Sequence, residues 1–334
     1  MNYNRFFAIM IYSKSTYEGN RMKMNFKKLA AAVLLTFGLA ANAAQDIRIF
    51  TADNNGGKVT AKTIEQAFKD AGFYITGNND MNKAFEAKFK DHAHDAYNLM
   101  TLHKKDAVSK LAAKYPEIAL FTPLSMSIFT RKGEKTISVS SMAAAGIAKI
   151  TGIPADNADL KAYMDEVAAV LAKAMPNGKF EATSYKIAKP EGDLVKRFTM
   201  DMDVKDDEIE DEIEGIQEEL EAGLETAGFV LAGFNRLNED FKAAGNDTYD
   251  FFDAYSICKV AVIYEVSKTH PEAGAFAPCT FYMSKKKGEK TVNFAYPAVY
   301  NWFSSIDVTD KASKDVLLKA QDAMNAAVGE ATEE

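Results

Sequence analysis

The sequence predicts an α+β fold built from two homologous repeats, each a largely antiparallel sheet packed with helices. Residues 64–85 and 220–241 match at 8 of 22 positions, and residues 116–138 and 271–293 match at 9 of 23. Chance would give roughly one identity in fifteen positions at this composition. In both repeats the apolar residues recur with the spacing of strands and helices in the same order. We therefore interpret the chain as a tandem duplication.

Length and composition agree with this interpretation. The chain has 334 residues, of which 47% are hydrophobic and 26% charged, as in ordinary globular proteins. At roughly 100–200 residues per domain, two domains are expected. The formal net charge of −7 opposes nucleic-acid binding, because neutralising phosphates requires a basic surface.

Each repeat opens with a strand, expected at residues 46–50 and 198–204, and an amphipathic helix follows. In the second repeat the apolar stripe of this helix is Ile209, Ile213, Ile216, Leu220 and Leu224. The acidic residues between 206 and 221 then form the solvated face of that helix. Gly228 ends the helix, since glycine readily adopts the left-handed conformation, and Phe229 begins the next strand.

The middle of each repeat contains a strand and a helix. We expect the strands at residues 97–102 and 251–257, and the helices at 105–114 and 260–269. A proline, Pro116 or Pro271, lies just beyond each of these helices, as is common after a helix end.

Two further strands and a closing helix complete each repeat. The strands are joined by Lys-Gly-Glu-Lys turns at residues 132–135 and 287–290, a sequence typical of hairpins. The closing helices are expected at 157–175 and 309–328. Polar residues with Gly and Pro between the repeats indicate a linker, so we place the repeats at 44–190 and 191–330.

The N-terminus has the features of a secretory signal peptide. Lys27 and Lys28 precede the apolar stretch 29–39, and Ala41-Asn42-Ala43 fits a cleavage site after Ala43. An uncleaved anchor is the alternative, but this stretch is well short of the ~20 residues that span a bilayer. Residues 1–43 are thus an N-terminal extension and signal peptide, with translation expected to start at Met22 or Met24.

Cleavage would change the charge and the compartment of the protein. Residues 1–43 contain six basic residues and one acidic residue, so the mature chain carries 34 basic and 46 acidic groups. This balance suits an exported protein and opposes anionic lipid or nucleic acid as a partner. We expect a periplasmic location, with no membrane attachment after cleavage and with both cysteines in an oxidising compartment.

The second repeat resembles a known family. Cys258 follows a strand, His270-Pro271-Glu272 ends the next helix, and Pro278-Cys279 opens another strand. This order resembles the signature of domain-of-unknown-function family 302 (DUF302), over residues 205–300 and more weakly over 50–145. The resemblance implies a compact α+β fold and a site at the cysteines, but no reaction. The first repeat departs from it, with His103 and Leu124 at the two cysteine positions.

Cys258 and Cys279 are the main site candidates, and their chemistry stays open between three interpretations. They could form a structural disulfide, a labile redox pair or thiolate metal or cofactor site, or two independent buried thiols. The chain contains no CxxC sequence, so a thioredoxin-type mechanism has no support.

The histidines are weaker candidates. His92 and His94 have the His-x-His spacing that metals use on strands, although a solvated loop before the strand is the simpler interpretation. His103 is aligned with Cys258, and its alternative role is packing at a strand end. Trp302 is expected in the core or between the repeats.

These observations favour a non-catalytic exported module that binds a small ligand, a metal or a cofactor. The alternatives are a periplasmic thiol-redox protein that uses Cys258 and Cys279, and a purely structural envelope protein. No catalytic motif is present in the sequence, the cofactor is unknown, and the partner is an unidentified small ligand or periplasmic protein. We expect the two repeats to pack as an intramolecular pseudo-dimer, because duplicated units commonly preserve an isologous contact.

Overall fold

The computed structural model describes residues 45–183, 185–204 and 208–333. The extension, signal peptide and cleavage site predicted within residues 1–43 lie outside the described residues. We call residues 45–183 the first half and residues 185–333 the second half. Among the described residues, no helix has the length and hydropathy needed to cross a membrane.

The elements of the first half come in the order strand, helix, strand, helix, strand, helix, two strands and two helices, followed by a short strand. They are β1 (Ile47–Asp53), α2 (Ala61–Asp70), β2 (Tyr74–Asp80), α3 (Met81–Phe89), β3 (His94–His103), α4 (Lys105–Ala112), the 3-10 helix η1 (Pro116–Phe121), β4 (Leu124–Arg131), β5 (Thr136–Met142), α5 (Ala144–Thr151), α6 (Ala158–Ala174) and β6 (Lys179–Phe180).

The second half repeats this order up to its last helix. Its elements are β7 (Val195–Asp201), α7 (Ile209–Thr226), β8 (Val230–Arg236), α8 (Leu237–Ala243), β9 (Tyr249–Cys258), α9 (Val260–Ser267), the 3-10 helix η2 (Pro271–Ala275), β10 (Cys279–Lys286), β11 (Thr291–Pro297), α10 (Tyr300–Ile306) and α11 (Lys311–Glu330).

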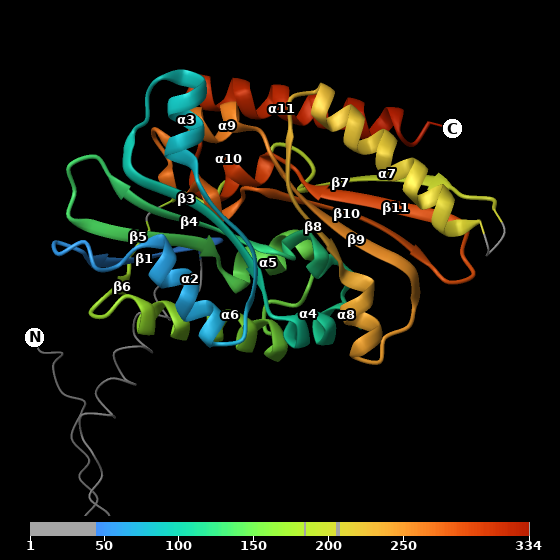
Figure 1. Cartoon of the computed structure of the whole chain (residues 1–334), viewed down its shortest axis with the longest axis horizontal. Coiled ribbons are helices and arrows are strands. Elements are labelled where there is room, and N and C mark those ends of the chain that lie inside the picture. The colour runs from blue at the N-terminus through green and yellow to red at the C-terminus, as the bar shows by residue number, and fades with distance from the viewer. Residues whose placement is uncertain (1–44, 184, 205–207, 334) are drawn as a thin grey trace, which may run out of the picture. The chain divides into compact units, whose positions relative to one another are not determined.

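The two sheets have the same strand order. The first runs β2-β3-β4-β5-β1-β6 and the second β8-β9-β10-β11-β7, and every pairing within them is antiparallel (Figure 1). The α+β class with two antiparallel sheets and packed helices is therefore confirmed. The short strand β6 extends the first sheet beyond β1, and it has no counterpart beside β7 among the described strands.

Local sequence signals account for the helices. The Thr60 and Thr63 side chains each accept the backbone N–H of the other residue and so cap α2. Asn157 and Asp310 cap α6 and α11 in the same way from their side-chain oxygens. In α7, Ile216, Leu220 and Leu224 from the predicted apolar stripe are buried.

One predicted strand differs in position from the structure, and several short helices were not predicted. The strand expected at 198–204 lies at Val195–Asp201, because Met202 and Val204 already belong to the loop before α7. The short helices α3, α5, α8 and α10 and both 3-10 helices were missed. Each has ten residues or fewer, too few to show a helical period clearly.

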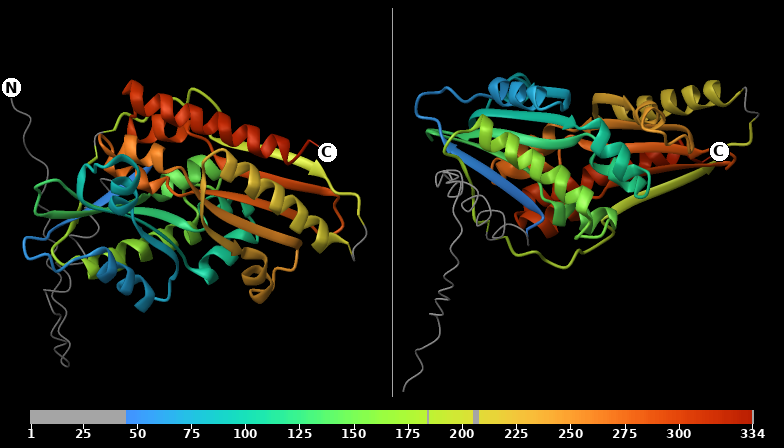
Figure 2. Two further views of the ribbon diagram at one scale, coloured as in Figure 1. Left: turned by 45° about the horizontal axis from the view of Figure 1, so that its top comes forward. Right: turned by 90° about the horizontal axis from the view of Figure 1, so that it is seen from below.

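Each sheet has one face covered by its own long helices. In the second half, α7 and α11 lie side by side over Phe251, Phe281 and Phe294 (Figure 2). The opposite face of the same sheet, which includes Phe252 and Tyr282, belongs to a larger core shared with the first half. The halves therefore meet through the sheet faces that their long helices leave uncovered.

The two 3-10 helices cross between the halves. η2 packs against β4 and β5 of the first half, and η1 packs against β10 of the second. Ser127 Oγ and Tyr97 Oη donate to the Pro271 carbonyl, at 2.8 and 2.9 Å. Ser140 Oγ donates to the Glu272 carbonyl at 2.8 Å. Buried serines of the first sheet thus satisfy carbonyl groups of η2.

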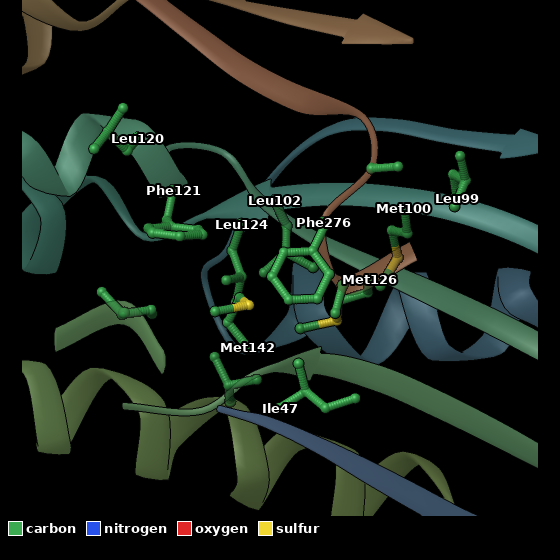
Figure 3. Packing of buried hydrophobic residues seen from close by; sticks show 14 of the residues in the cluster. Ile47, Leu99, Met100, Leu102, Leu120, Phe121, Leu124, Met126, Met142 and Phe276 are labelled. Carbon is green, nitrogen blue, oxygen red and sulfur yellow. The ribbon is translucent and has the colours of Figure 1, made fainter. Parts of the chain in front are cut away.

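Apolar contacts accompany these hydrogen bonds. Phe276, which follows η2, lies among Leu102, Leu124 and Met126 of the first half (Figure 3). Gly274 approaches the first sheet so closely that a Cβ atom there would lie 2.4 Å from Ser127 Cβ. The contact between the halves is therefore as tightly packed as a protein core.

Candidate functional site

Cys258 and Cys279 lie on neighbouring strands. Cys258 is the last residue of β9, Cys279 is the first residue of β10, and Cys279 pairs with Ile257 in the ladder. Both are free thiols, and Cys258 is buried. The Cys279 thiol donates to the Phe276 carbonyl, with a sulfur–oxygen distance of 3.2 Å. The fold brings the two cysteines to the same end of the second sheet.

A small cavity adjoins both thiols. Its volume is about 60 Å³, and we call it the thiol cavity. Its walls come from the end of the sheet, from α9 and α10, and from α11. They are formed by Phe229, Ile257, Cys258, Lys259, Val262, Ile263, Ala277, Cys279, Tyr296, Pro297, Val299, Trp302, Leu317, Ala320, Gln321 and Met324. The walls are overwhelmingly apolar, as in sites that hold small molecules.

Burial keeps both thiols protonated. Desolvation raises the pKa of Cys258 to about 12, with a smaller contribution from Cys279, and it raises the pKa of Cys279 to about 12. A thiol with such a pKa is almost entirely neutral at pH 7, whereas nucleophilic and redox cysteines depend on the thiolate. The cavity therefore presents two neutral sulfur atoms.

Lys259 and Gln321 in the walls have hydrogen-bond partners outside the cavity. Lys259 Nζ donates to the Ala227 carbonyl at 2.8 Å and lies 4.8 Å from the centre of the Phe229 ring. Gln321 Oε1 accepts the backbone N–H of Val299 at 2.9 Å. These interactions hold the lysine and the glutamine in place, and they leave apolar contact as the main interaction open to a ligand.

Trp302 forms part of the wall and connects it to the contact between the halves. The indole is buried and stacks on Phe276, with ring centres 5.5 Å apart. Phe276 also belongs to the core shared by the halves. The expected core or inter-repeat position of Trp302 agrees with this burial, and the residue additionally lines the thiol cavity.

The first half has different residues at the corresponding positions. His103 and Leu124 stand at the places of Cys258 and Cys279 in β3 and β4. Counting from the helix caps Asn157 and Asp310, Val167 of α6 corresponds to Ala320 of α11. Leu124 and Val167 are fully buried and larger than their counterparts, so the first half has less room at this point.

His103 takes part in a contact between the halves and is not a wall residue of the thiol cavity. Its ring is buried and packs edge-on against Tyr74, at 5.4 Å between ring centres. His103 Nε2 lies 3.7 Å from Asp240 Oδ2 of the second half, and Lys105 Nζ donates to Asp240 Oδ1 at 2.8 Å. Burial raises the Asp240 pKa, but the neighbouring His103 and Lys105 outweigh it and lower the pKa below its usual value.

The loop interpretation of the His92–His94 segment is wrong for His94. His94 is the first residue of β3. It is buried, and its ring stacks on Tyr97 with the ring centres 4.9 Å apart. Its Nε2 donates to the Ser267 carbonyl of the second half at 3.0 Å, and burial lowers its pKa. His92 precedes the strand, where its Nδ1 donates to the His94 carbonyl at 2.8 Å.

The described residues provide no cluster of three or more His, Cys, Asp or Glu side chains that could hold a metal ion. Sequence reasoning missed the wall formed by α11, including Ala320, Gln321 and Met324. A usable signal was present in the repeat. At matching places in the closing helices, the second half has a smaller residue than the first.

Comparison with known proteins bears on the first half. A family model described as "Domain of unknown function DUF302" matches residues 54–177, although the sequence resemblance was stronger over residues 205–300. The crystal structure of an uncharacterized conserved DUF302 protein from Bacillus stearothermophilus is also similar, at 18% identity and a TM-score of 0.33. The similarity covers 41% of this chain and 97% of that one. A search of the curated proteins gave no match. Residues 54–177 of this chain therefore match the DUF302 family.

Proposed function

We propose that this protein is an exported, non-catalytic binding module that holds a small uncharged molecule in the thiol cavity. The observation that carries the proposal is the apolar cavity of about 60 Å³ beside two protonated thiols. A water molecule needs roughly 10–15 Å³ of such space, so the cavity suits a ligand, or the end of one, of only a few heavy atoms.

The chemistry of the walls supports an uncharged ligand. An ion in this cavity would lose its hydration, and Lys259 Nζ and Gln321 Oε1 already form hydrogen bonds elsewhere. Sulfur atoms and aromatic rings are polarizable, so Cys258, Cys279 and Trp302 favour a soft, apolar molecule.

Native mass spectrometry of the protein exported to a periplasm tests the proposal together with its location. The expected mature chain begins at Ala44 and carries a small retained molecule. Xenon NMR on the same sample provides a probe of stated chemistry, because xenon enters apolar cavities without needing hydrogen bonds. A saturable xenon shift is expected for the wild-type protein.

Matched variants come from the first half. Ala320→Val and Cys279→Leu copy the residues Val167 and Leu124, so both should fold while reducing the cavity. Loss of the xenon shift and of the retained mass in these variants supports the proposal. Equal xenon binding by wild-type and Ala320→Val proteins would refute it, as would the absence of both signals in the wild-type protein.

The thiol-redox alternative depends on one observation, the position of Cys258 and Cys279 on paired strands. Their raised pKa values oppose it, because disulfide exchange needs a thiolate. The reduction potential of the pair separates the alternatives. A working redox pair should have a potential well above about −300 mV, whereas a structural bridge should lie below it. If the protein is purely structural, replacing both cysteines by serine should change stability alone.

A further inference from the structure

A second cavity lies in the second half between α7 and the sheet, and it shares no lining residue with the thiol cavity. Its volume is about 670 Å³, and we call it the Asp253 groove. α7 provides one wall, and β9 and the start of α8 provide the floor. The proposed function makes no use of this groove.

The floor of the groove contains a buried carboxyl group. Asp253 is only 6% exposed and lies on the face of β9 that also carries Phe251 and Tyr255 beneath α7. Gln217 Nε2 of α7 donates to Asp253 Oδ2 at 2.9 Å. No lysine, arginine or histidine in the described ranges forms an ion pair with Asp253. Burial therefore raises its pKa to about 6.

A second acceptor belongs to a residue that lines the same groove. This residue, Asn238, is 7% exposed. Its Nδ2 donates to the Asp250 carbonyl at 2.8 Å, whereas its Oδ1 has no hydrogen-bond partner among the described residues. Leaving a buried amide oxygen without a donor costs free energy. A ligand that supplies an N–H donor here would remove this cost.

The first half has an equivalent groove without the buried acid. It has a volume of about 570 Å³ and includes Asn98, whose place in β3 corresponds to that of Asp253 in β9. Asn98 Nδ2 donates to Asn78 Oδ1 at 3.1 Å, and Asn78 Nδ2 donates to Glu65 Oε2 at 2.9 Å. These three side chains are therefore hydrogen-bonded to one another. Asn82, which stands at the place of Asn238 in the first half, has the same Oδ1 without a partner among the described residues, so the feature specific to the second half is the buried acid Asp253.

The charges around the Asp253 groove indicate the sign of its ligand. The lining residues include five carboxyl groups and three cationic groups, which are Glu210, Glu214, Glu239, Asp250 and Asp253 against Arg236, Lys242 and Lys287. Their formal sum is −2 when Asp253 is ionised. The absence of a metal-holding cluster among the described residues favours an organic cation over a metal ion.

We propose that the Asp253 groove binds an alkyl diamine or a similar small polyamine, with one ammonium group donating to the Asp253 carboxylate and the Asn238 Oδ1. An ammonium group has three donors and no acceptor, which complements a floor made of acceptors. Two positive charges match the groove's excess of two carboxylates. The groove is large enough for an alkyl chain to extend from the floor toward Glu214 and Glu239 at its rim.

Isothermal titration calorimetry of the full mature protein with cadaverine tests this site. Saturable binding is expected at about pH 8, with affinity at least tenfold weaker in Asp253→Asn and about tenfold weaker at pH 5, where a carboxyl group with a pKa of about 6 is mostly protonated. The neutral analogue pentane-1,5-diol should not bind. Asp253→Asn copies Asn98 of the first half, so it should fold.

Two controls make the result specific. Glu65→Gln alters the equivalent groove of the first half and should leave cadaverine affinity unchanged. Xenon binding to the thiol cavity should be the same in Asp253→Asn and wild-type protein, so failure of either site is distinguishable from failure of the other. The proposal is overturned if cadaverine shows no saturable binding, if Asp253→Asn binds it as the wild type does, or if the diol binds equally well.

Discussion

Asp253 lies between apolar residues on a face of β9 that α7 covers, and its ionised form is unfavourable there. Its pKa is raised from 3.8 to about 6, so the native state binds its proton more tightly than the unfolded state does. The stability associated with this proton is complete below about pH 4 and is lost as the pH rises through 6.

Asp253→Asn should therefore stabilise the protein at high pH more than at low pH. The gain in the free energy of unfolding should be up to about 3 kcal/mol at pH 8 and should disappear near pH 4, because a shift of one pKa unit corresponds to about 1.4 kcal/mol. Urea unfolding of both proteins across this range measures the difference. A gain that did not depend on pH would show that ionisation of Asp253 is not its cause.

The cysteine thiols should react slowly while the protein is folded. Their pKa of about 12 leaves about three orders of magnitude less thiolate than in a free cysteine at the same pH. We expect iodoacetamide to modify Cys258 and Cys279 rapidly in urea and at least a hundredfold more slowly in buffer, as followed by intact mass. Equal rates would place at least one thiol at the surface.

At the residue scale, the sequence indicated that the two cysteines would lie close together, but it did not indicate the cavity beside them. A cysteine at the end of one strand and another at the start of the next predict proximity. The cavity beside them depends on Ala320 and Met324 of α11, which are more than 40 residues further along the chain. Asp253 also went unnoticed, although a lone acid within the apolar run 251–255 was a readable signal.

At the scale of elements, long periodic segments were predictable and short ones were not. α7 and α11 have repeated apolar positions over four or more turns, whereas η1 and η2 have a single proline and no period. The partners of η1 and η2 are strands of the other half, so their packing depends on contacts more than 130 residues apart. Local propensity contains no information about such contacts.

Gly274→Ala tests the packing of η2 on the first sheet. The added Cβ would lie 2.4 Å from Ser127 Cβ and 2.7 Å from Leu99 Cδ2, so the element must shift. We expect a loss of about 1–3 kcal/mol in the free energy of unfolding, measured in urea.

Gly215→Ala in α7 is the matched control. No atom lies within 4 Å of the added Cβ, and alanine favours a helix over glycine, so this variant should gain about 0.5–1 kcal/mol. If both substitutions changed the free energy of unfolding by the same amount, the close approach of Gly274 to the first sheet would not be the cause of the loss.

At the scale of the whole molecule, the described residues between 45 and 333 belong to one compact unit, although the sheets and their helices suggest two. Each half covers a sheet face of the other, and Ser127, Ser140 and His94 of the first half donate hydrogen bonds to backbone carbonyls of the second. Neither sheet could lose its partner without exposing buried apolar surface. These reciprocal contacts support the proposed intramolecular pseudo-dimer.

The two halves should therefore unfold in one cooperative transition. Fluorescence of Trp302, the single tryptophan in the chain, reports on the second half, whereas far-UV circular dichroism reports on both. We expect the two signals to coincide in guanidinium, and Gly274→Ala should move them together. Separate midpoints would show that each half is stable without the other.

The short strand β6 has a consequence for how the protein behaves in concentrated solution. It covers the outer edge of β1, whereas β7 has no such neighbour in the part of the chain described. An open strand edge can recruit a strand from another chain. Lys196, Arg197 and Asp201 place charges along β7, and charged side chains on an edge oppose such recruitment. Salt weakens this protection, so we expect β7 to pair with a strand of another chain more readily at high ionic strength.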